Sequence, residues 1–79
     1  MFVNNVIVYS TSTCPWCTKV KEYLNSNDIE FTEYNVQTDR EKAMEMVEKS
    51  GQRGVPVLDI NGTIVVGFDK ENIDNLLGL

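Results

Sequence analysis

The alternation of hydrophobic and polar segments along the chain predicts seven elements of secondary structure. Residues 6–9 form a continuous apolar run, which is typical of a strand buried on both faces of a sheet. From Pro15 onward, apolar residues recur at three- and four-residue spacing, which predicts an amphipathic helix that ends within residues 25–28. The other predicted elements are a strand over residues 30–36, a helix from Thr38 to Gly51, strands over Val57–Ile60 and Thr63–Val66, and a helix after Asp69.

Three short motifs set boundaries between these elements. Thr38 and Glu41 form a capping box, in which the Thr38 hydroxyl accepts from the Glu41 N–H and the Glu41 side chain reaches back to the Thr38 N–H. Asn61-Gly62 between two β-branched runs predicts a two-residue hairpin turn. Asp69 precedes the last helical pattern and is its predicted N-cap.

The order of the elements is β-α-β-α-β-β-α, which favours an α/β fold. The first two strands flank a helix, and strands joined in this way pair in parallel. The hairpin adds antiparallel strands, so we expect a four-stranded mixed sheet with helices on both faces. The length of 79 residues suits one small domain, and we expect residues 1–79 to form it.

Composition and charge argue against several classes of protein. The net charge is −5 and no basic cluster is present, so a nucleic-acid partner is not expected. No apolar stretch is long enough to span a membrane. The first five residues lack the basic and apolar regions of a signal peptide. We therefore expect a cytoplasmic protein without a membrane partner and, since nothing in the sequence signals an oligomer, a monomer.

The only two cysteines, Cys14 and Cys17, enclose Pro15 and Trp16 where the first strand meets the first helix. A structural disulfide would close a very short loop and would be unusual in the cytoplasm. A zinc site needs about four ligands, but the chain has no other cysteine and no histidine, so no metal site is expected. Two inert buried thiols remain an alternative. A Cys-x-x-Cys pair beside a βαβ pattern nevertheless favours thioredoxin-like redox chemistry.

The predicted helix assigns different roles to the two thiols. Cys14 falls at about the N-cap, where unpaired N–H groups and the positive end of the helix stabilise a thiolate. Cys14 is therefore the predicted nucleophile. Cys17 lies one turn later in a more shielded position, and it is the predicted resolving thiol that attacks the mixed disulfide on Cys14. For Pro56, the residues alone leave open a trans strand starter or a cis proline that presents the preceding backbone to a ligand.

Three motifs taken together resemble the glutaredoxin family: Cys14-Pro15-Trp16-Cys17, Val55-Pro56 and Gly67-Phe68-Asp69. The resemblance covers nearly the whole chain. It implies a thioredoxin-like fold, a cis Val55–Pro56 bond that faces the cysteines, and Val55 backbone groups that pair with the cysteine-bearing segment of a substrate. The predicted substrate-binding residues are Pro15, Trp16, Arg53, Val55, Pro56, Gly67, Phe68 and Asp69.

The chain departs from glutathione-using members of that family at four positions. Thr11 stands where a lysine is common, and Gly54 where a threonine is frequent. Val66 stands where the first of two glycines is usual, and Lys70 where a second aspartate is usual. These changes weaken the expected glutathione site, although Arg53 remains as a carboxylate partner unless it is simply solvated. The single glycine followed by Phe68 is similar to small redoxins that a flavoprotein thioredoxin reductase reduces, some of which serve ribonucleotide reductase.

We therefore expect a dithiol thiol–disulfide oxidoreductase with no bound cofactor. It would reduce protein disulfides, with ribonucleotide reductase or a peroxiredoxin as possible substrates, and also glutathione mixed disulfides. A flavoprotein reductase or glutathione would recycle it. The alternative is a dimer that holds an iron–sulfur cluster through one cysteine of each chain, with glutathione as further ligands. Cys17 favours the reductase, because a resolving thiol competes with cluster ligation.

Overall fold

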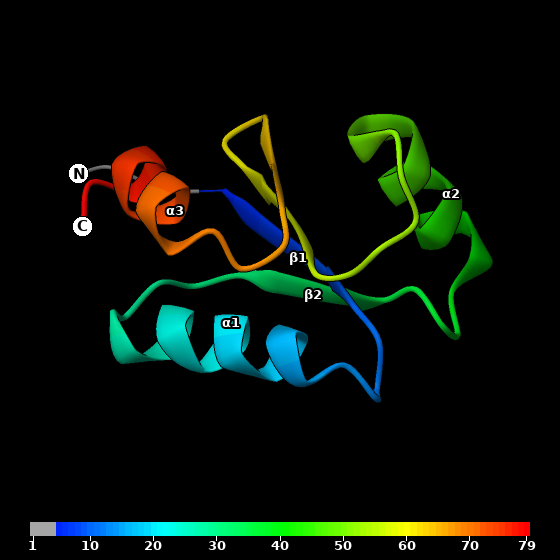
Figure 1. Ribbon diagram of the computed structural model, residues 1–79, viewed down its shortest axis with the longest axis horizontal. Coiled ribbons are helices and arrows are strands. Elements are labelled where there is room, and N and C mark those ends of the chain that lie inside the picture. Colours follow the sequence, from blue (N-terminus) through cyan, green and yellow to red (C-terminus); the bar gives the residue numbers. More distant parts are fainter. Residues whose placement is uncertain (1–4) are drawn as a thin grey trace.

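The computed structural model describes residues 5–79. Residues 1–4 lie outside the described residues. The expectations about a leader segment and about the start of the domain depend partly on these residues. Seven elements follow one another along the chain (Figure 1). They are β1 (Val6–Ser10), α1 (Pro15–Ser26), β2 (Thr32–Asn35), α2 (Arg40–Ser50), β3 (Val57–Ile60), β4 (Thr63–Val66) and α3 (Lys70–Leu77).

The four strands form one mixed sheet in the order β2-β1-β3-β4. β1 runs parallel to β2 and antiparallel to β3, and β3 pairs antiparallel with β4. At the turn between β3 and β4, Asn61 has φ 52° and Gly62 has φ 94°. Both angles are positive, as a tight two-residue hairpin turn requires. The predicted mixed sheet and the predicted Asn-Gly turn are therefore confirmed.

Helices cover both faces of the sheet, as the sequence predicted: α1 and α3 lie on one face and α2 on the other (Figure 1). The alternation of side chains along β1 serves both layers. Val6 and Val8 belong to the core beneath α1 and α3, whereas Ile7 and Tyr9 belong to the core beneath α2. The larger core consists of Val6, Val8, Val20, Leu24, Leu58, Ile60, Val65 and Ile73.

Two sequence-based boundaries need correction. The second strand covers Thr32–Asn35, shorter than the predicted residues 30–36, because its pairing with β1 begins only at the partners Ile7 and Thr32. The N-cap of α2 is Asp39, whose carboxylate accepts from the Lys42 N–H at 3.2 Å.

Thr38 is not the cap of α2 because it closes the turn that leaves β2. Both its N–H and its hydroxyl donate to the Asn35 carbonyl, at 3.3 Å each. The predicted capping box is therefore wrong.

A polar network fastens α2 to the sheet. Lys49 pairs with Asp59 at 2.8 Å and also donates to the Tyr9 oxygen at 3.0 Å. The Tyr9 hydroxyl in turn donates to Glu45 at 2.9 Å. The pKa of Lys49 is raised because Asp59 and then Tyr9 accept its hydrogen bonds. These contacts fix the helix over the ends of β1 and β3, beside the segment that carries Val55.

Candidate active site

Cys14 occupies the N-cap of α1, as the sequence predicted. Its backbone is extended, with φ −97° and ψ 108°, and Pro15 follows as the first helical residue. The Cys14 Sγ accepts a hydrogen bond from the Cys17 N–H at 3.2 Å. A cap atom that accepts from the helix terminus is stabilised further when it carries negative charge. The geometry thus suits a thiolate at Cys14.

Cys17 has a different environment on the inner side of α1. Its side chain is fully buried, whereas Cys14 is only half-buried, and both cysteines are free thiols. Burial, and after it the hydrogen bond to Cys14, raises the pKa of Cys17 to about 11. At neutral pH, Cys17 is therefore a protonated thiol held behind Cys14.

The segment before β3 lies directly against Cys14. The Val55–Pro56 bond is cis, as the resemblance implied. The Cys14 thiol donates to the Val55 carbonyl over 3.8 Å, a contact between residues 41 positions apart. On the other side, the Pro56 carbonyl accepts from the Gly67 N–H at 2.8 Å, which ties this segment to the turn after β4.

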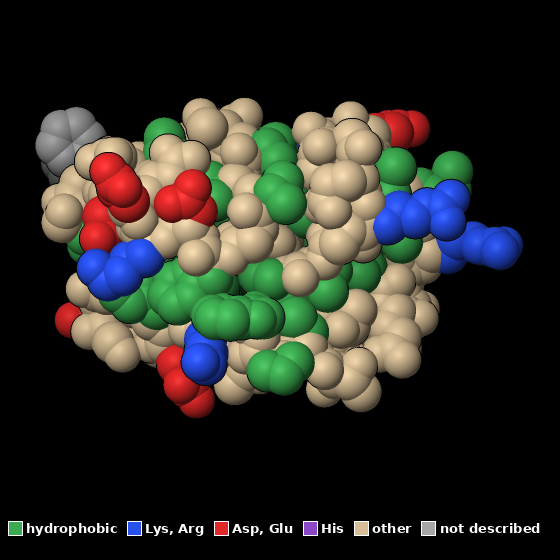
Figure 2. All heavy atoms as spheres, in the orientation of Figure 1, with side chains coloured by type: hydrophobic (Ala, Val, Ile, Leu, Met, Phe, Trp, Pro, Cys, Tyr) green, Lys and Arg blue, Asp and Glu red, His purple; other side chains and the backbone are tan. Residues whose placement is uncertain are grey.

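A shallow groove of about 260 Å³ lies beside the thiols and is lined by Trp16, Val55, Pro56, Gly67 and Phe68. The structure thus brings five of the predicted substrate-binding residues together. Trp16 is 56% exposed, and apolar side chains form a continuous band across this face of the molecule (Figure 2). A partner that carries an apolar surface can cover this band and the Cys14 sulfur together.

Aromatic and basic side chains that the sequence analysis did not single out border this groove. Lys19 lies over the Trp16 ring at 4.6 Å, and Tyr23 packs against Phe68 with ring centroids 5.6 Å apart. The Tyr23 hydroxyl donates to Asp74. Helical spacing could have revealed Lys19, which is three residues after Trp16, but nothing in the sequence places Tyr23 beside Phe68.

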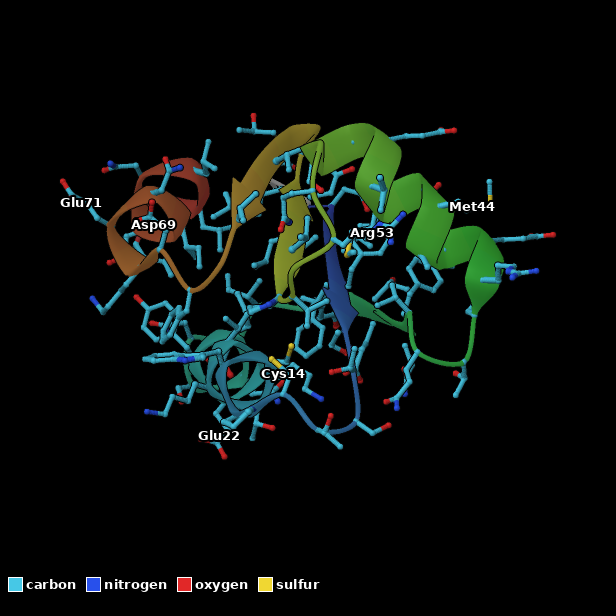
Figure 3. The ribbon with its side chains drawn as sticks, turned by 45° about the vertical axis from the view of Figure 1, so that its right-hand side comes forward. Cys14, Glu22, Met44, Arg53, Asp69 and Glu71 are labelled. Atoms are coloured by element: carbon cyan, nitrogen blue, oxygen red, sulfur yellow. The ribbon has the colours of Figure 1, made fainter. Side chains whose placement is uncertain are left out.

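Two predicted substrate-binding residues lie apart from the groove. Arg53 lines a separate groove along α2, and Asp69 lines a small recess at the start of α3 (Figure 3). The Asp69 carboxylate accepts from the Asn72 N–H at 3.3 Å, so the prediction that it caps the last helix is confirmed. A substrate contact of Arg53 or Asp69 stays a prediction. Pro15 is exposed at the first position of α1.

Gln52 was also missed, and it occupies the edge of the segment that leads to Val55. Its side-chain amide pairs with both backbone groups of Gly54, donating to the carbonyl at 3.0 Å and accepting from the N–H. A Cβ at position 54 would lie 2.7 Å from the Gln52 Oε1. The absence of a side chain at Gly54 therefore allows the Gln52 amide to form both hydrogen bonds with the Gly54 backbone.

Within residues 5–79, no three His, Cys, Asp or Glu side chains are grouped so that they could hold a metal ion. In the same part of the chain, no helix has the length and apolarity to cross a membrane.

Comparison with known proteins agrees with this geometry. The family model described as Glutaredoxin matches residues 6–65. An uncharacterized glutaredoxin-like 8.6 kDa protein in the rubredoxin operon of Clostridium pasteurianum is 53% identical over 70 residues, 89% of this chain and 93% of that one. Glutaredoxin 3 of Escherichia coli K12 is 34% identical over 65 residues, 82% of this chain and 78% of that one. The crystal structure of a mutant of the thioredoxin-like protein BC3987 superposes with a TM-score of 0.89 at 30% identity, covering 94% of this chain and 95% of that one.

The sheet order, the two thiols at the start of α1 and the family match define a thioredoxin-like redox protein. The chain belongs to the glutaredoxin family. In the broad sense of that family it is a thiol–disulfide oxidoreductase, which acts on disulfide substrates and needs a reductant to recycle it.

Proposed function

We propose that the protein reduces disulfides of other proteins by a dithiol mechanism, with Cys14 as nucleophile and Cys17 as resolving thiol. The observation that carries this proposal is the contrast between the two sulfurs. The Cys14 sulfur is half-buried at the N-terminus of α1 and accepts a hydrogen bond from the Cys17 N–H. The Cys17 sulfur is fully buried, and its pKa is raised to about 11.

In the first step, the Cys14 thiolate attacks one sulfur of the substrate disulfide. The substrate S–S bond breaks, a bond forms between Cys14 and the attacked sulfur, and the other substrate sulfur leaves as a thiolate that takes a proton from water. The groove beside Val55 and Pro56 suits the segment around the attacked cysteine, because it lies next to Cys14 and is lined by the apolar Trp16 and Phe68 side chains.

In the second step, the Cys17 sulfur attacks the Cys14 sulfur. The mixed disulfide breaks, the Cys14–Cys17 disulfide forms, and the second substrate sulfur leaves with the proton that Cys17 gives up. The substrate disulfide has gained two electrons from the protein and two protons, one from water and one from Cys17. A reductant must then reduce the Cys14–Cys17 disulfide before the next turnover.

The environment of Cys17 supports this order of events. After burial, the causes of its raised pKa include the hydrogen bond and the charge of Cys14. Once Cys14 has formed a bond to the substrate, its sulfur carries no charge, and the charge of Cys14 no longer raises the pKa of Cys17. Burial, the largest cause, still raises that pKa.

Turnover of insulin disulfides tests the mechanism. The unmodified protein is expected to reduce them catalytically, whereas Cys14→Ser and Cys17→Ser are each expected to lose this turnover. Cys17→Ser is expected to keep activity on glutathione mixed disulfides, which need only one thiol. Undiminished insulin reduction by Cys17→Ser would contradict the dithiol mechanism.

We further propose that a thioredoxin-reductase-type flavoprotein recycles the protein faster than glutathione does. Thr11 lacks the cation and Lys70 lacks the carboxylate that glutathione-using members commonly supply, and Lys70 is paired with Asp74 at 3.1 Å. An exposed charge pair contributes only ~0.2–1 kcal/mol, so these changes weaken glutathione binding without abolishing it. A flavoprotein can instead recognise the apolar surface around Trp16 and Phe68.

Two coupled assays on the oxidised protein distinguish the reductants. NADPH with thioredoxin reductase is expected to reduce it faster than glutathione with glutathione reductase. The double variant Thr11→Lys/Lys70→Asp is expected to raise only the glutathione-dependent rate. If glutathione already reduces the unmodified protein as fast as it reduces that variant, the departures at Thr11 and Lys70 have no effect on glutathione use.

A further inference from the structure

The only two arginines of the chain, Arg40 and Arg53, line the same groove along α2. The groove has a volume of about 560 Å³, within the usual range for a binding cleft. Its apolar lining includes Ala43, Met44 and Val47, and Met44 is 60% exposed. An exposed, flexible methionine is typical of surfaces that adapt to apolar partners. The groove thus combines two cations with an apolar floor.

Within the described residues, the two arginines differ from four of the five lysines in having no carboxylate partner. Four of the five lysines form ion pairs: Lys21 with Glu33, Lys42 with Glu45, Lys49 with Asp59 and Lys70 with Asp74. The fifth, Lys19, lies over the Trp16 ring. Within residues 5–79, neither Arg40 nor Arg53 forms an ion pair, although Glu48 also lines their groove. In a chain of net charge −5, the free guanidinium groups are thus gathered at one place.

This groove is separate from the groove beside Cys14, but the two grooves have lining residues that are close along the chain. Arg53 lies two residues before Val55 in the chain. The Val55 carbonyl accepts a hydrogen bond from the Cys14 thiol. Two residues span at most ~7 Å, so a polypeptide that touches Val55 can reach Arg53 with its neighbouring residues. In the view of Figure 3, Arg53 lies between Cys14 and Met44.

Charged side chains of both signs lie at both ends of this face (Figure 2). Lys70 lies in α3 beside its acidic residues, and α2 carries Glu41, Glu45 and Glu48 as well as its basic residues. The attraction of an acidic segment to this groove therefore depends on the two guanidinium groups and not on the charge of the α2 end as a whole.

We propose that the groove between Arg40 and Arg53 binds a carboxylate-bearing, partly apolar segment of the protein whose disulfide Cys14 reduces. Guanidinium groups pair with carboxylates through two parallel hydrogen bonds, and Met44 contacts an apolar side chain between them. The inference rests on the proposed function. It adds a preference for disulfides whose cysteines have acidic neighbours.

Two peptide disulfides test this preference with the full chain. Both contain a leucine and a cysteine, and they differ only in having glutamates or glutamines on either side of the cysteine. The measured quantity is the ratio of kcat/KM for the acidic peptide to kcat/KM for the amide peptide. Since each exposed pair has a modest effect, Arg40→Gln is expected to lower the ratio about two- to fivefold. Arg40→Gln/Arg53→Gln is expected to bring it to about one, as is high salt.

Matched variants separate the groove from general charge effects. Lys42→Gln removes the same charge from the same helix outside the groove, and it is expected to leave the ratio unchanged. Glu48→Gln is expected to raise the ratio, whereas Glu41→Gln, an equal charge change outside the groove, is not. If Lys42→Gln lowers the ratio as much as Arg40→Gln does, the groove is not the binding site.

The remaining outcomes are also decisive. Equal kcat/KM for the two peptides in the unmodified protein would overturn the inference, while reduction of the amide peptide would still support the dithiol mechanism. If neither peptide is reduced, the proposed function itself fails. If Arg40→Gln lowers the rate with a glutathione mixed disulfide by the same factor as with the acidic peptide, the occupant is glutathione and the inference is wrong.

Discussion

Cys14 and Cys17 are one helical turn apart, and their surroundings differ in the two properties that decide thiol reactivity. The Cys14 sulfur lies at the N-cap, where it accepts from the Cys17 N–H at 3.2 Å, next to the groove. The Cys17 sulfur is fully buried beneath it. Helix position favours an anion at one sulfur, and burial disfavours an anion at the other. The proposed division of roles between the two thiols rests on this difference.

The raised pKa of Cys17 predicts a loss of stability at alkaline pH. Its ordinary value of about 9 becomes about 11 in the folded, reduced protein, so folding holds this proton more tightly. Below pH 9 the Cys17 thiol is protonated in both the folded and the unfolded protein, and its contribution to the free energy of unfolding is fully present. Between about pH 9 and 11 the thiol loses its proton only in the unfolded protein. The free energy of unfolding therefore falls by up to ~1.4 kcal/mol per pH unit in this range.

Urea unfolding of the reduced protein from pH 8 to 11 measures this loss, and Cys17→Ser is the matched control because serine does not titrate in this range. The unmodified protein is expected to lose more stability than the variant across that window. Parallel curves for the two proteins would show that burial of Cys17 does not hold its proton.

Gly54 provides a second prediction at a single residue. A Cβ at this position meets the Gln52 Oε1 at 2.7 Å, so Gly54→Ala must displace the Gln52 amide from the Gly54 backbone. Two partly exposed hydrogen bonds are lost, while the unfolded chain loses some freedom, so a net loss of about 0.5–2 kcal/mol is expected. In a Gln52→Ala background, Gly54→Ala should leave the free energy of unfolding unchanged. A double-mutant cycle by urea unfolding measures the difference, and equal costs in both backgrounds would refute the contact.

The start of α2 illustrates how neighbouring polar residues compete to cap a helix. Thr38 and Glu41 have the spacing of a capping box, but Asp39 can cap as well, and the sequence does not say which residue the preceding turn uses. In the structure, the Asn35 carbonyl accepts from both Thr38 and Asp39 backbone N–H groups. The turn after β2 thus positions Asp39 rather than Thr38 at the helix terminus.

The corrected cap predicts unequal effects of two neighbouring substitutions. Asp39→Ala removes the acceptor for the Lys42 N–H and is expected to cost about 1 kcal/mol of unfolding free energy. Thr38→Ala removes an exposed hydroxyl bond at 3.3 Å and should stay within about 0.5 kcal/mol. Urea denaturation of both variants provides the comparison. A larger loss of unfolding free energy for Thr38→Ala than for Asp39→Ala would show that Thr38 caps α2.

At the scale of the whole molecule, periodicity and turn chemistry predicted the element order, the mixed sheet and the two helical layers. These features depend on local signals, such as the apolar run in β1 and the Asn61-Gly62 turn. The length of β2 was overestimated because it is an edge strand, whose extent depends on its single partner rather than on its own residues.

The site was less predictable, since it joins segments distant in sequence. The position of Cys14 at the helix N-terminus followed from local pattern, but the cis Val55–Pro56 bond and its approach to Cys14 came from the family resemblance. The contact between Tyr23 and Phe68 and the shared groove of Arg40 and Arg53 depend on how helices pack on the sheet. No local motif encodes either of these contacts.

Capture of a substrate by the two single-cysteine variants tests the central claim most directly. Reduced Cys17→Ser and Cys14→Ser are each incubated with a peptide disulfide, quenched with acid and weighed intact by mass spectrometry. We predict that Cys17→Ser gains the mass of one peptide and keeps it, because no resolving thiol remains. Cys14→Ser should gain none, because Cys17 is buried and protonated. A stable adduct on Cys14→Ser, with none on Cys17→Ser, would contradict the assignment of the nucleophile.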